Sequence, residues 1–156
     1  MQLRLIAVGP RQPEWVNTAF CEYSRRFPGE CRLELTELAL GPRGKGRDPQ
    51  HALAVESERM IKAIPSHAWV VALDERGTAW TSRELARRLE GWMNSGQDVA
   101  LLMGGPDGLS AACKAHAREQ WSLSALTLPH GLARVVVAEA LYRAHSLLKG
   151  HPYHRD

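Results

Sequence analysis

Three short apolar runs restrict the fold of this chain more than any other feature of its sequence. They read LRLIAVG (3–9), AWVVALD (68–74) and DVALLMGG (98–105), and each has the length of one β-strand. A continuous apolar run is typical of a parallel strand that is covered on both faces, whereas a strand with one face in water alternates apolar and polar residues. The runs therefore predict a buried, mainly parallel sheet.

Helical patterns separate the predicted strands. After Pro13, the residues Trp15, Ala19 and Tyr23 recur every four positions, which predicts an amphipathic helix over 13–27. The remaining expected elements are a half-exposed strand at 31–40 and helices at 51–64, 82–96, 109–119 and about 132–148.

The alternating order of these elements predicts an α/β fold. We expect one domain over residues 1–156, built on a mainly parallel, twisted sheet with helices on both faces. Within it, Ser82 is the expected cap of the helix at 82–96, and Gly96 is its expected end.

The last helix is apolar around nearly its whole circumference. In LARVVVAEALYRA the only charged residues are Arg134, Glu139 and Arg143, and the last two are spaced to form an i,i+4 pair. A surface helix shows a single apolar stripe, so this helix is expected to be buried on two sides. One side would face the sheet and the other a second copy of the chain, which predicts a homodimer.

Positive charge gathers in two segments of a chain whose net charge is +3. The glycine-rich GPRGKGR (41–47) holds Arg43, Lys45 and Arg47 without an acid, and residues 131–155 hold four Lys and Arg against Glu139 alone. Phosphate groups are the usual partners of such segments. The alternative interpretation is a solvated loop and a solvated helix face.

Several common sites are absent from the sequence. GPRGKG is no P-loop because Lys45 is followed by glycine, and LLMGGPDG departs from the dinucleotide pattern G-x-G-x-x-G. Cys21, Cys31 and Cys113 form no Cys-x-x-Cys pair, so we expect reduced thiols rather than disulfides or a zinc site. No apolar run approaches the ~20 residues of a membrane span, and a cytoplasmic protein is expected.

Three segments without strong charge are expected to meet at one edge of the sheet. They are Leu73-Asp74, the glycines of GGPDG (104–108) and the uncharged SLSALTLPHG (122–131). Ligands of open α/β sheets bind beyond the carboxyl ends of the strands. An apolar pocket lined by backbone groups suits adenine and ribose better than a triphosphate. GGPDG could instead be a tight turn, and Asp74 could cap a turn.

The C-terminal HPYHRD is the other dense cluster of polar side chains. Tyr153, His154 and Arg155 suit stacking on a base and contact with phosphate. A metal site at His151 and His154 is a weaker hypothesis because Asp156 and the terminal carboxylate are the only nearby acids and no cysteine is close. A frayed polar tail is the remaining interpretation.

The motifs LLMGGPDGL, WSLSALTLPHGLARVVVAEALYRA and HPYHR closely resemble the SPOUT-class methyltransferases, and specifically the small bacterial RlmH family. The resemblance extends to LIAVG, EYSRRF and ALDERG, and so to nearly the whole chain. It implies a deep trefoil knot in the C-terminal third that binds S-adenosyl-L-methionine (SAM). It also implies a homodimer with a composite active site, and methylation of N3 of a pseudouridine in 23S ribosomal RNA, on the assembled 70S ribosome. No metal is implied.

The resemblance also implies roles for particular residues. The expected cofactor pocket is lined by Leu73, Gly104, Gly105, Leu123, Ser124, Ala125, Leu126, Thr127 and Leu128. The tail residues Tyr153, His154 and Arg155 would meet the RNA base. His130 is by default a residue at the entry of the last helix.

Methyl transfer to an imide nitrogen requires in-line geometry and loss of the N–H proton. His154 has the pKa class of a base, whereas Arg155 or Arg143 could stabilise the anionic ring; the sequence leaves both open. Two other classes of function compete with a methyltransferase: an RNA-binding module without catalysis, and an α/β enzyme with a flavin or nicotinamide cofactor.

Overall fold

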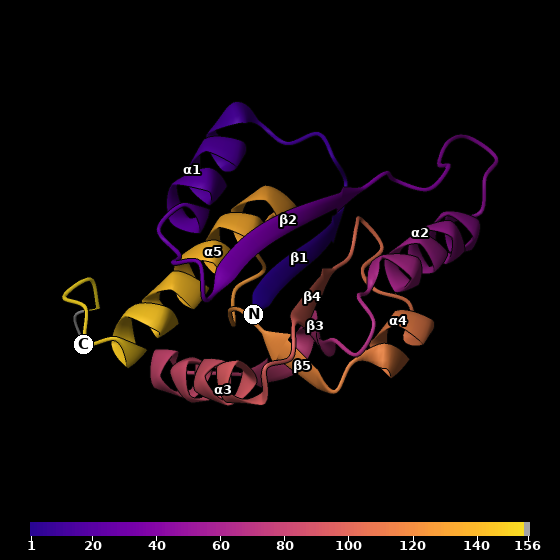
Figure 1. The fold of residues 1–156 in the computed structure, drawn as a ribbon. Coiled ribbons are helices and arrows are strands. Elements are labelled where there is room, and N and C mark those ends of the chain that lie inside the picture. The colour runs from indigo at the N-terminus through magenta and orange to yellow at the C-terminus, as the bar shows by residue number, and fades with distance from the viewer. Residues whose placement is uncertain (155–156) are drawn as a thin grey trace.

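Five parallel strands form the centre of the molecule in the computed structural model, which describes residues 1–154 (Figure 1). They are β1 (Gln2–Val8), β2 (Arg32–Leu38), β3 (Trp69–Ala79), β4 (Val99–Met103) and β5 (Glu119–Ser122). Their order in the sheet is β2-β1-β4-β3-β5, and each adjacent pair is parallel. The predicted parallel sheet is confirmed. Arg155, a predicted RNA-contacting residue, lies outside the described residues.

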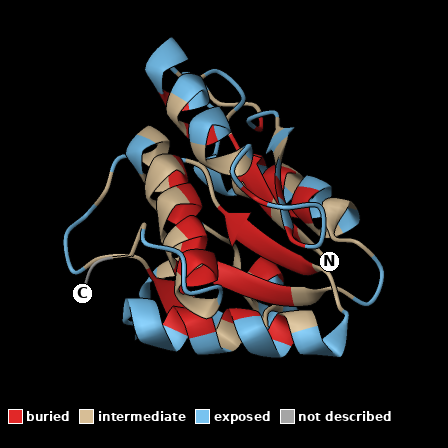
Figure 2. Cartoon of the chain, turned by 60° about the vertical axis from the view of Figure 1, so that its left-hand side comes forward, coloured by how far each residue is buried: buried red, intermediate tan, exposed pale blue. Residues whose placement is uncertain are grey.

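Helices cover both faces of this sheet. They are α1 (Glu14–Ser24), α2 (Pro49–Ala63), α3 (Ser82–Ser95), α4 (Ala111–His116) and α5 (His130–Leu148). Leu3, Leu5 and Ala7 of β1 belong to the core shared with α1, α3 and α5, whereas Ile6 and Val8 belong to the core shared with α2 and α4. Burial on both faces explains the continuous apolar strands, and Figure 2 shows the buried sheet between half-exposed helices.

The strand β5 was not among the predicted elements, and the helix predicted over 109–119 is shorter than expected. α4 ends at His116, Ala117 is already extended, and the Arg118 N–H donates to the Val70 carbonyl of β3 at 2.9 Å. Only Trp121 and Ser122 of the four β5 residues are buried. The sequence EQWS therefore carries too short an apolar signal to indicate a strand.

The strand β3 continues past the point where the sequence predicted its end. Leu73 and Thr78 both lie opposite Trp121, so residues 74–77 bulge out of the ladder with β5. A side chain at Gly77 would lie 2.7 Å from the Gln120 backbone, which explains the glycine. Asp74 thus projects from a bulge instead of a strand end.

The ends of α3 confirm one expected boundary and correct the other. Thr81, not Ser82, is the cap: its Oγ1 accepts from the Glu84 N–H at 3.1 Å, and the Thr81 N–H donates to the Glu84 carboxylate at 2.7 Å. This reciprocal pair is a capping box. Gly96 ends the helix in the left-handed conformation (φ 70°), as predicted.

Neighbouring helices of the same chain explain much of the apolar character of α5. α1 and α3 flank it, and the Glu139–Arg143 pair forms as predicted, with a 2.6 Å contact. Arg134, the third charged residue of this helix, is fully buried. Leu132, 38% exposed in the first turn, is the large apolar side chain of α5 that remains open to solvent.

Candidate functional site

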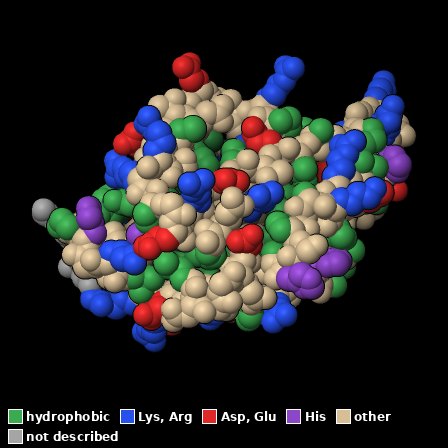
Figure 3. Space-filling view, in the orientation of Figure 1, with side chains coloured by type: hydrophobic (Ala, Val, Ile, Leu, Met, Phe, Trp, Pro, Cys, Tyr) green, Lys and Arg blue, Asp and Glu red, His purple; other side chains and the backbone are tan. Residues whose placement is uncertain are grey.

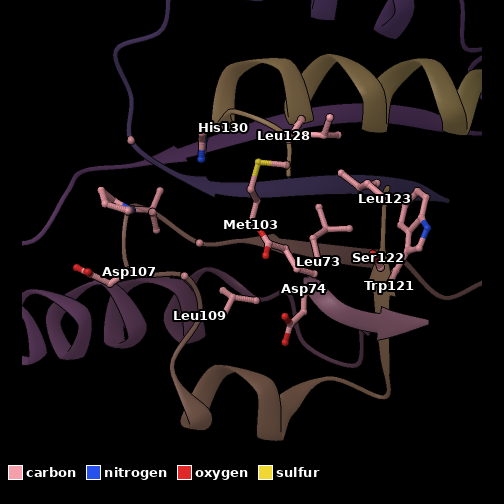
Figure 4. A pocket seen from close by; sticks show the side chains of 18 of the residues that line it. Leu73, Asp74, Met103, Asp107, Leu109, Trp121, Ser122, Leu123, Leu128 and His130 are labelled. Atoms are coloured by element: carbon pink, nitrogen blue, oxygen red, sulfur yellow. The ribbon is translucent and has the colours of Figure 1, made fainter. Parts of the chain in front are cut away.

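A cavity of about 890 Å³ lies at the carboxyl ends of the strands (Figure 4). Its walls come from residues 8–12 after β1, 73–76 of β3, 103–109 after β4, 121–128 around the end of β5, and the first turn of α5. The predicted convergence of segments at this edge is confirmed. The volume falls in the range of sites for small molecules and cofactors.

Most of the predicted cofactor residues line this cavity. They are Leu73, Gly104, Gly105, Leu123, Ser124, Leu126 and Leu128. Ala125 and Thr127 are exposed and are not among the lining residues. The predicted segment therefore lies at the cavity, with Ala125 and Thr127 outside its lining, and its binding of the cofactor stays a prediction.

The hydroxyl groups of the segment 122–128 hold its backbone. Ser122 Oγ donates to the Ser124 carbonyl at 3.2 Å, and Ser124 Oγ accepts from the Leu126 N–H at 2.9 Å. These local bonds replace partners that a regular element would provide. The serines thus shape the loop, and leucine side chains line the cavity.

The glycines of GGPDG form a tight turn that is also a cavity wall. A Cβ on Gly104 would lie 2.4 Å from the Gly108 backbone, and Gly108 has φ +74°. The Gly108 N–H donates to the Gly105 carbonyl at 3.0 Å. The two interpretations of this motif are compatible, since the turn brings backbone to the cavity surface.

A buried cation supports the wall at the start of α5. Arg134 Nε donates to His130 Nε2 at 2.9 Å, its guanidinium pairs with Glu37 at 2.8 Å, and it also donates to the Gly9 carbonyl. The first contact requires Nε2 of His130 to be unprotonated. Sequence reasoning missed Arg134 as a site residue, because a lone arginine in a helix gives no signal of burial.

His130 faces the cavity, as Figure 4 shows, and is held neutral there. Burial first, and then the Arg134 guanidinium, lower the pKa of His130 below its ordinary value, although a hydrogen bond with the Gly104 backbone opposes this. The ring thus links α5 to the GGPDG turn. It is a fixed part of the cavity wall.

One charged pair lies in the opposite wall. Asp74 accepts from Lys114 Nζ at 2.8 Å and from the Arg76 N–H at 3.0 Å. These bonds, that of Lys114 first, lower the pKa of Asp74 despite its partial burial. The pair supplies fixed polar groups to a cavity lined by both apolar and polar side chains.

In the described part of the C-terminal tail, Tyr153 packs against α5. The Tyr153 ring lies edge-on to Tyr142, with centroids 4.7 Å apart, and its Oη donates to Glu139 at 3.0 Å. Arg143 lies 5.1 Å from the centroid of the same ring and is itself bound by Glu139. Burial first, then hydrogen bonds to Tyr23 and Glu139, raise the pKa of Tyr153. The tyrosine thus holds the tail on α5.

Tyr153 and His154, two of the predicted RNA-contacting residues, do not line the cavity of their own chain. The cavity includes His130 and Ala133 at the start of α5, whereas the tail follows its last residue, Leu148. A helix of 19 residues is about 28 Å long. His154 Nδ1 is buried and has no hydrogen-bond partner among residues 1–154.

The described residues give no support to a metal site in the tail. His151 Nδ1 accepts from the Tyr153 N–H at 3.1 Å and so stabilises the turn. Across residues 1–154, no three His, Cys, Asp or Glu side chains are grouped as metal ligands would be.

Over the same residues, no helix combines the length and apolar character needed to cross a membrane.

Comparison with known structures defines the class of this fold and site. Residues 1–154 match the family model described as "Predicted SPOUT methyltransferase". TrmJ from Z. mobilis ZM4 has a TM-score of 0.55 at 20% identity, covering 92% of this chain and 70% of that chain. Lpg2936 from Legionella pneumophila, solved with bound SAM, has a TM-score of 0.51 at 12% identity, with coverages of 92% and 66%. The fold is the α/β knot of SPOUT methyltransferases, which confirms the predicted knot.

Curated relatives narrow the class to one kind of enzyme. The ribosomal RNA large subunit methyltransferase H of Thioalkalivibrio sulfidiphilus is 54% identical over all of both chains, and that of Alkalilimnicola ehrlichii is 56% identical over 99% of both. The chain belongs to the ribosomal RNA large subunit methyltransferase H family of SPOUT methyltransferases.

Proposed function

We propose that this protein transfers a methyl group from SAM to N3 of a pseudouridine in 23S ribosomal RNA, in the cytoplasm and on the assembled ribosome. The observation that carries the proposal is the cavity at the carboxyl ends of the strands, lined by the segment 122–128. Relatives that match the whole chain are named for methylation of large-subunit ribosomal RNA. The whole chain is proposed to act as one domain.

The cavity residues fit SAM. Leu123, Leu126 and Leu128 offer apolar contact to adenine, and the glycines of the turn at 104–108 expose backbone groups, since a Cβ at Gly104 would clash with the Gly108 backbone. Asp74 is an ionised acceptor that suits ribose hydroxyls or the cationic part of the cofactor. When bound, SAM supplies an electrophilic methyl group.

The enzyme's own contribution is orientation and proton removal. The pseudouridine N3 becomes a nucleophile when its proton is lost, and the nitrogen must approach in line with the methyl carbon. His130 is neutral and bonded by Arg134, so it is unsuited to this proton transfer. We assign the removal of this proton to His154, because His130 is bonded by Arg134 and His151 Nδ1 is engaged in the turn of the tail.

A second copy of the chain would bring His154 to the cavity. The tail and the cavity lie at opposite ends of α5, so one chain alone leaves the site incomplete. Large exposed apolar side chains lie at the cavity end, namely Trp15 (55% exposed), Leu126 (75%) and Leu132 (38%). Such side chains are typical of protein interfaces. They support a homodimer in which each tail serves the partner's cavity.

Mixing two impaired variants tests this composite site. Gly104→Ala damages the cavity, and His154→Ala removes the base but leaves the cavity intact. At a SAM concentration near the wild-type Kd, each variant alone should methylate ribosomes far more slowly than the wild type. Subunit exchange between them should restore methylation, because some dimers then hold one intact cavity facing one intact tail. A mixture that stays as slow as the single variants after exchange, shown by mass-labelled subunits, would refute the composite site.

A further inference from the structure

The glycine-rich cationic loop between β2 and α2 has no role in the site described above. It spans residues 41–48 and contains Arg43, Lys45 and Arg47. Figure 3 shows Lys and Arg side chains gathered over this segment, at the end of the molecule beyond α2. Its base and its tip differ sharply in their contacts.

The base of the loop is fixed and its charge is neutralised. Arg43 pairs through both terminal nitrogens with Glu56, which is 2% exposed, and also with Asp107 at 3.0 Å. Glu56 accepts the Gly41 N–H at 2.8 Å as well. A Cβ on Gly41 would lie 2.4 Å from the Ala52 backbone, so this end is tightly packed against α2.

The tip of the loop presents free cations. Lys45 and Arg47 are exposed, and neither has an ion pair or side-chain hydrogen bond in the described part of the chain. Gly44 and Gly46 have φ of +152° and +80°, and no atom lies within 4 Å of a Cβ built on either. Two unpaired cations on an open, glycine-flanked turn suit an extended polyanion, which can adapt to them.

The fixed base connects this tip to the rim of the cavity. Asp107, which holds Arg43, belongs to the GGPDG turn, and both Asp107 and Leu40 line the cavity. Lys45 follows Arg43 by two residues, so their Cα atoms are at most about 7 Å apart. An RNA strand whose target base enters the cavity must continue past this rim.

We propose that Lys45 and Arg47 bind backbone phosphates of the RNA that flank the target nucleotide, and that Arg43, with Glu56 and Asp107, holds this arm in register with the cavity. The proposal rests on the proposed function, since it takes ribosomal RNA as the substrate. A chain of 156 residues that acts as one domain would thus carry its own RNA-binding element beside the cofactor site.

Equilibrium binding to 70S ribosomes at several salt concentrations tests the arm. Lys45→Ala/Arg47→Ala should weaken binding about 10- to 30-fold at ~0.15 M salt, and the slope of log K against log salt should become shallower by about 1.5, as expected for two lost phosphate contacts. Affinity for SAM, measured by calorimetry, should stay unchanged because both side chains lie outside the cavity lining.

A matched double variant controls for net charge. Arg32→Ala/Arg87→Ala removes two exposed cations, from the amino end of β2 and from α3, and should keep the wild-type salt slope. If the two double variants bind ribosomes with equal affinity and equal salt slope, and the wild type still methylates ribosomes, the proposed RNA-binding role of Lys45 and Arg47 is refuted. The proposed methyltransferase function would stand in that case. A wild type that neither binds nor methylates ribosomes would instead refute the proposed function.

Binding to protein-free large-subunit RNA shows whether the partner of Lys45 and Arg47 is RNA or an acidic ribosomal protein. The loss caused by Lys45→Ala/Arg47→Ala should persist on this RNA if phosphates are the partners. A loss on ribosomes with no loss on the free RNA would overturn the proposal in favour of a ribosomal protein.

Discussion

Replacing Gly104 with alanine should damage the cofactor cavity without unfolding the protein. The new Cβ would lie 2.4 Å from the carbonyl carbon and oxygen of Gly108 and 2.8 Å from the Leu109 nitrogen. These are backbone atoms, so no side chain can rotate away, and ordinary contact distance requires the turn to open by about 1 Å. A displacement of about 1 Å in a site that positions its ligand can lower the reaction rate by up to about 100-fold.

We therefore expect Gly104→Ala to weaken SAM binding by at least about tenfold in isothermal calorimetry. The matched control is Gly91→Ala on α3, where no atom lies within 4 Å of the added Cβ. That change should leave SAM binding intact and stabilise the fold by about 0.5–1 kcal/mol, because alanine favours helix over glycine. Circular dichroism checks that both variants fold. Wild-type SAM affinity in a folded Gly104→Ala variant would refute the assignment of the cavity.

Three further predictions concern the supports of the site. Arg134→Met should destabilise the fold by about 2–4 kcal/mol in urea denaturation, since it leaves Glu37 and the Gly9 carbonyl without their partner; a loss below about 1 kcal/mol would contradict this role. Tyr153→Phe should lower kcat with little change in the SAM Kd, because it loses only the hydroxyl bonds to Tyr23 and Glu139 that position the tail, and Tyr153→Ala should lower kcat further; a raised SAM Kd would place the tyrosine at the cofactor instead. The pKa of His130 is lowered in the folded state, so its contribution to stability is present above the unfolded pKa of about 6.5 and is lost as pH falls through the folded pKa. His130→Gln should therefore show a shallower decline of unfolding free energy below about pH 6.5 than the wild type, and parallel curves would contradict this.

The position of the site followed from the sequence because it depends on chain order. Three continuous apolar runs require a parallel sheet, and the carboxyl ends of parallel strands meet at one edge. Chain order alone therefore predicted that Leu73, Gly104 and the segment from Leu123 lie close together, and all three line one cavity. The knot came from the resemblance alone, since knotted chains are rare and leave no periodic pattern.

The parts that sequence reasoning missed depend on contacts between distant residues. Arg134 is buried because Glu37, 97 residues away, and the Gly9 carbonyl satisfy its charge. Glu56 is buried because Arg43 and the Gly41 N–H satisfy it. Neither pairing leaves a mark in local composition. The ring of Tyr153 packs against Tyr142, a contact between residues 11 positions apart that local composition does not indicate, and its expected contact with RNA stays a prediction.

Nucleoside mass spectrometry of ribosomal RNA tests the central claim most directly. Ribosomes from cells that lack this protein, incubated with the purified protein and SAM, should gain one methyl group on a single pseudouridine of 23S ribosomal RNA, and fragmentation should place it on the base at N3. Incubation with the His154→Ala variant should leave that nucleoside unmethylated. Unchanged 23S pseudouridine after incubation with active, SAM-binding protein would contradict the proposed function.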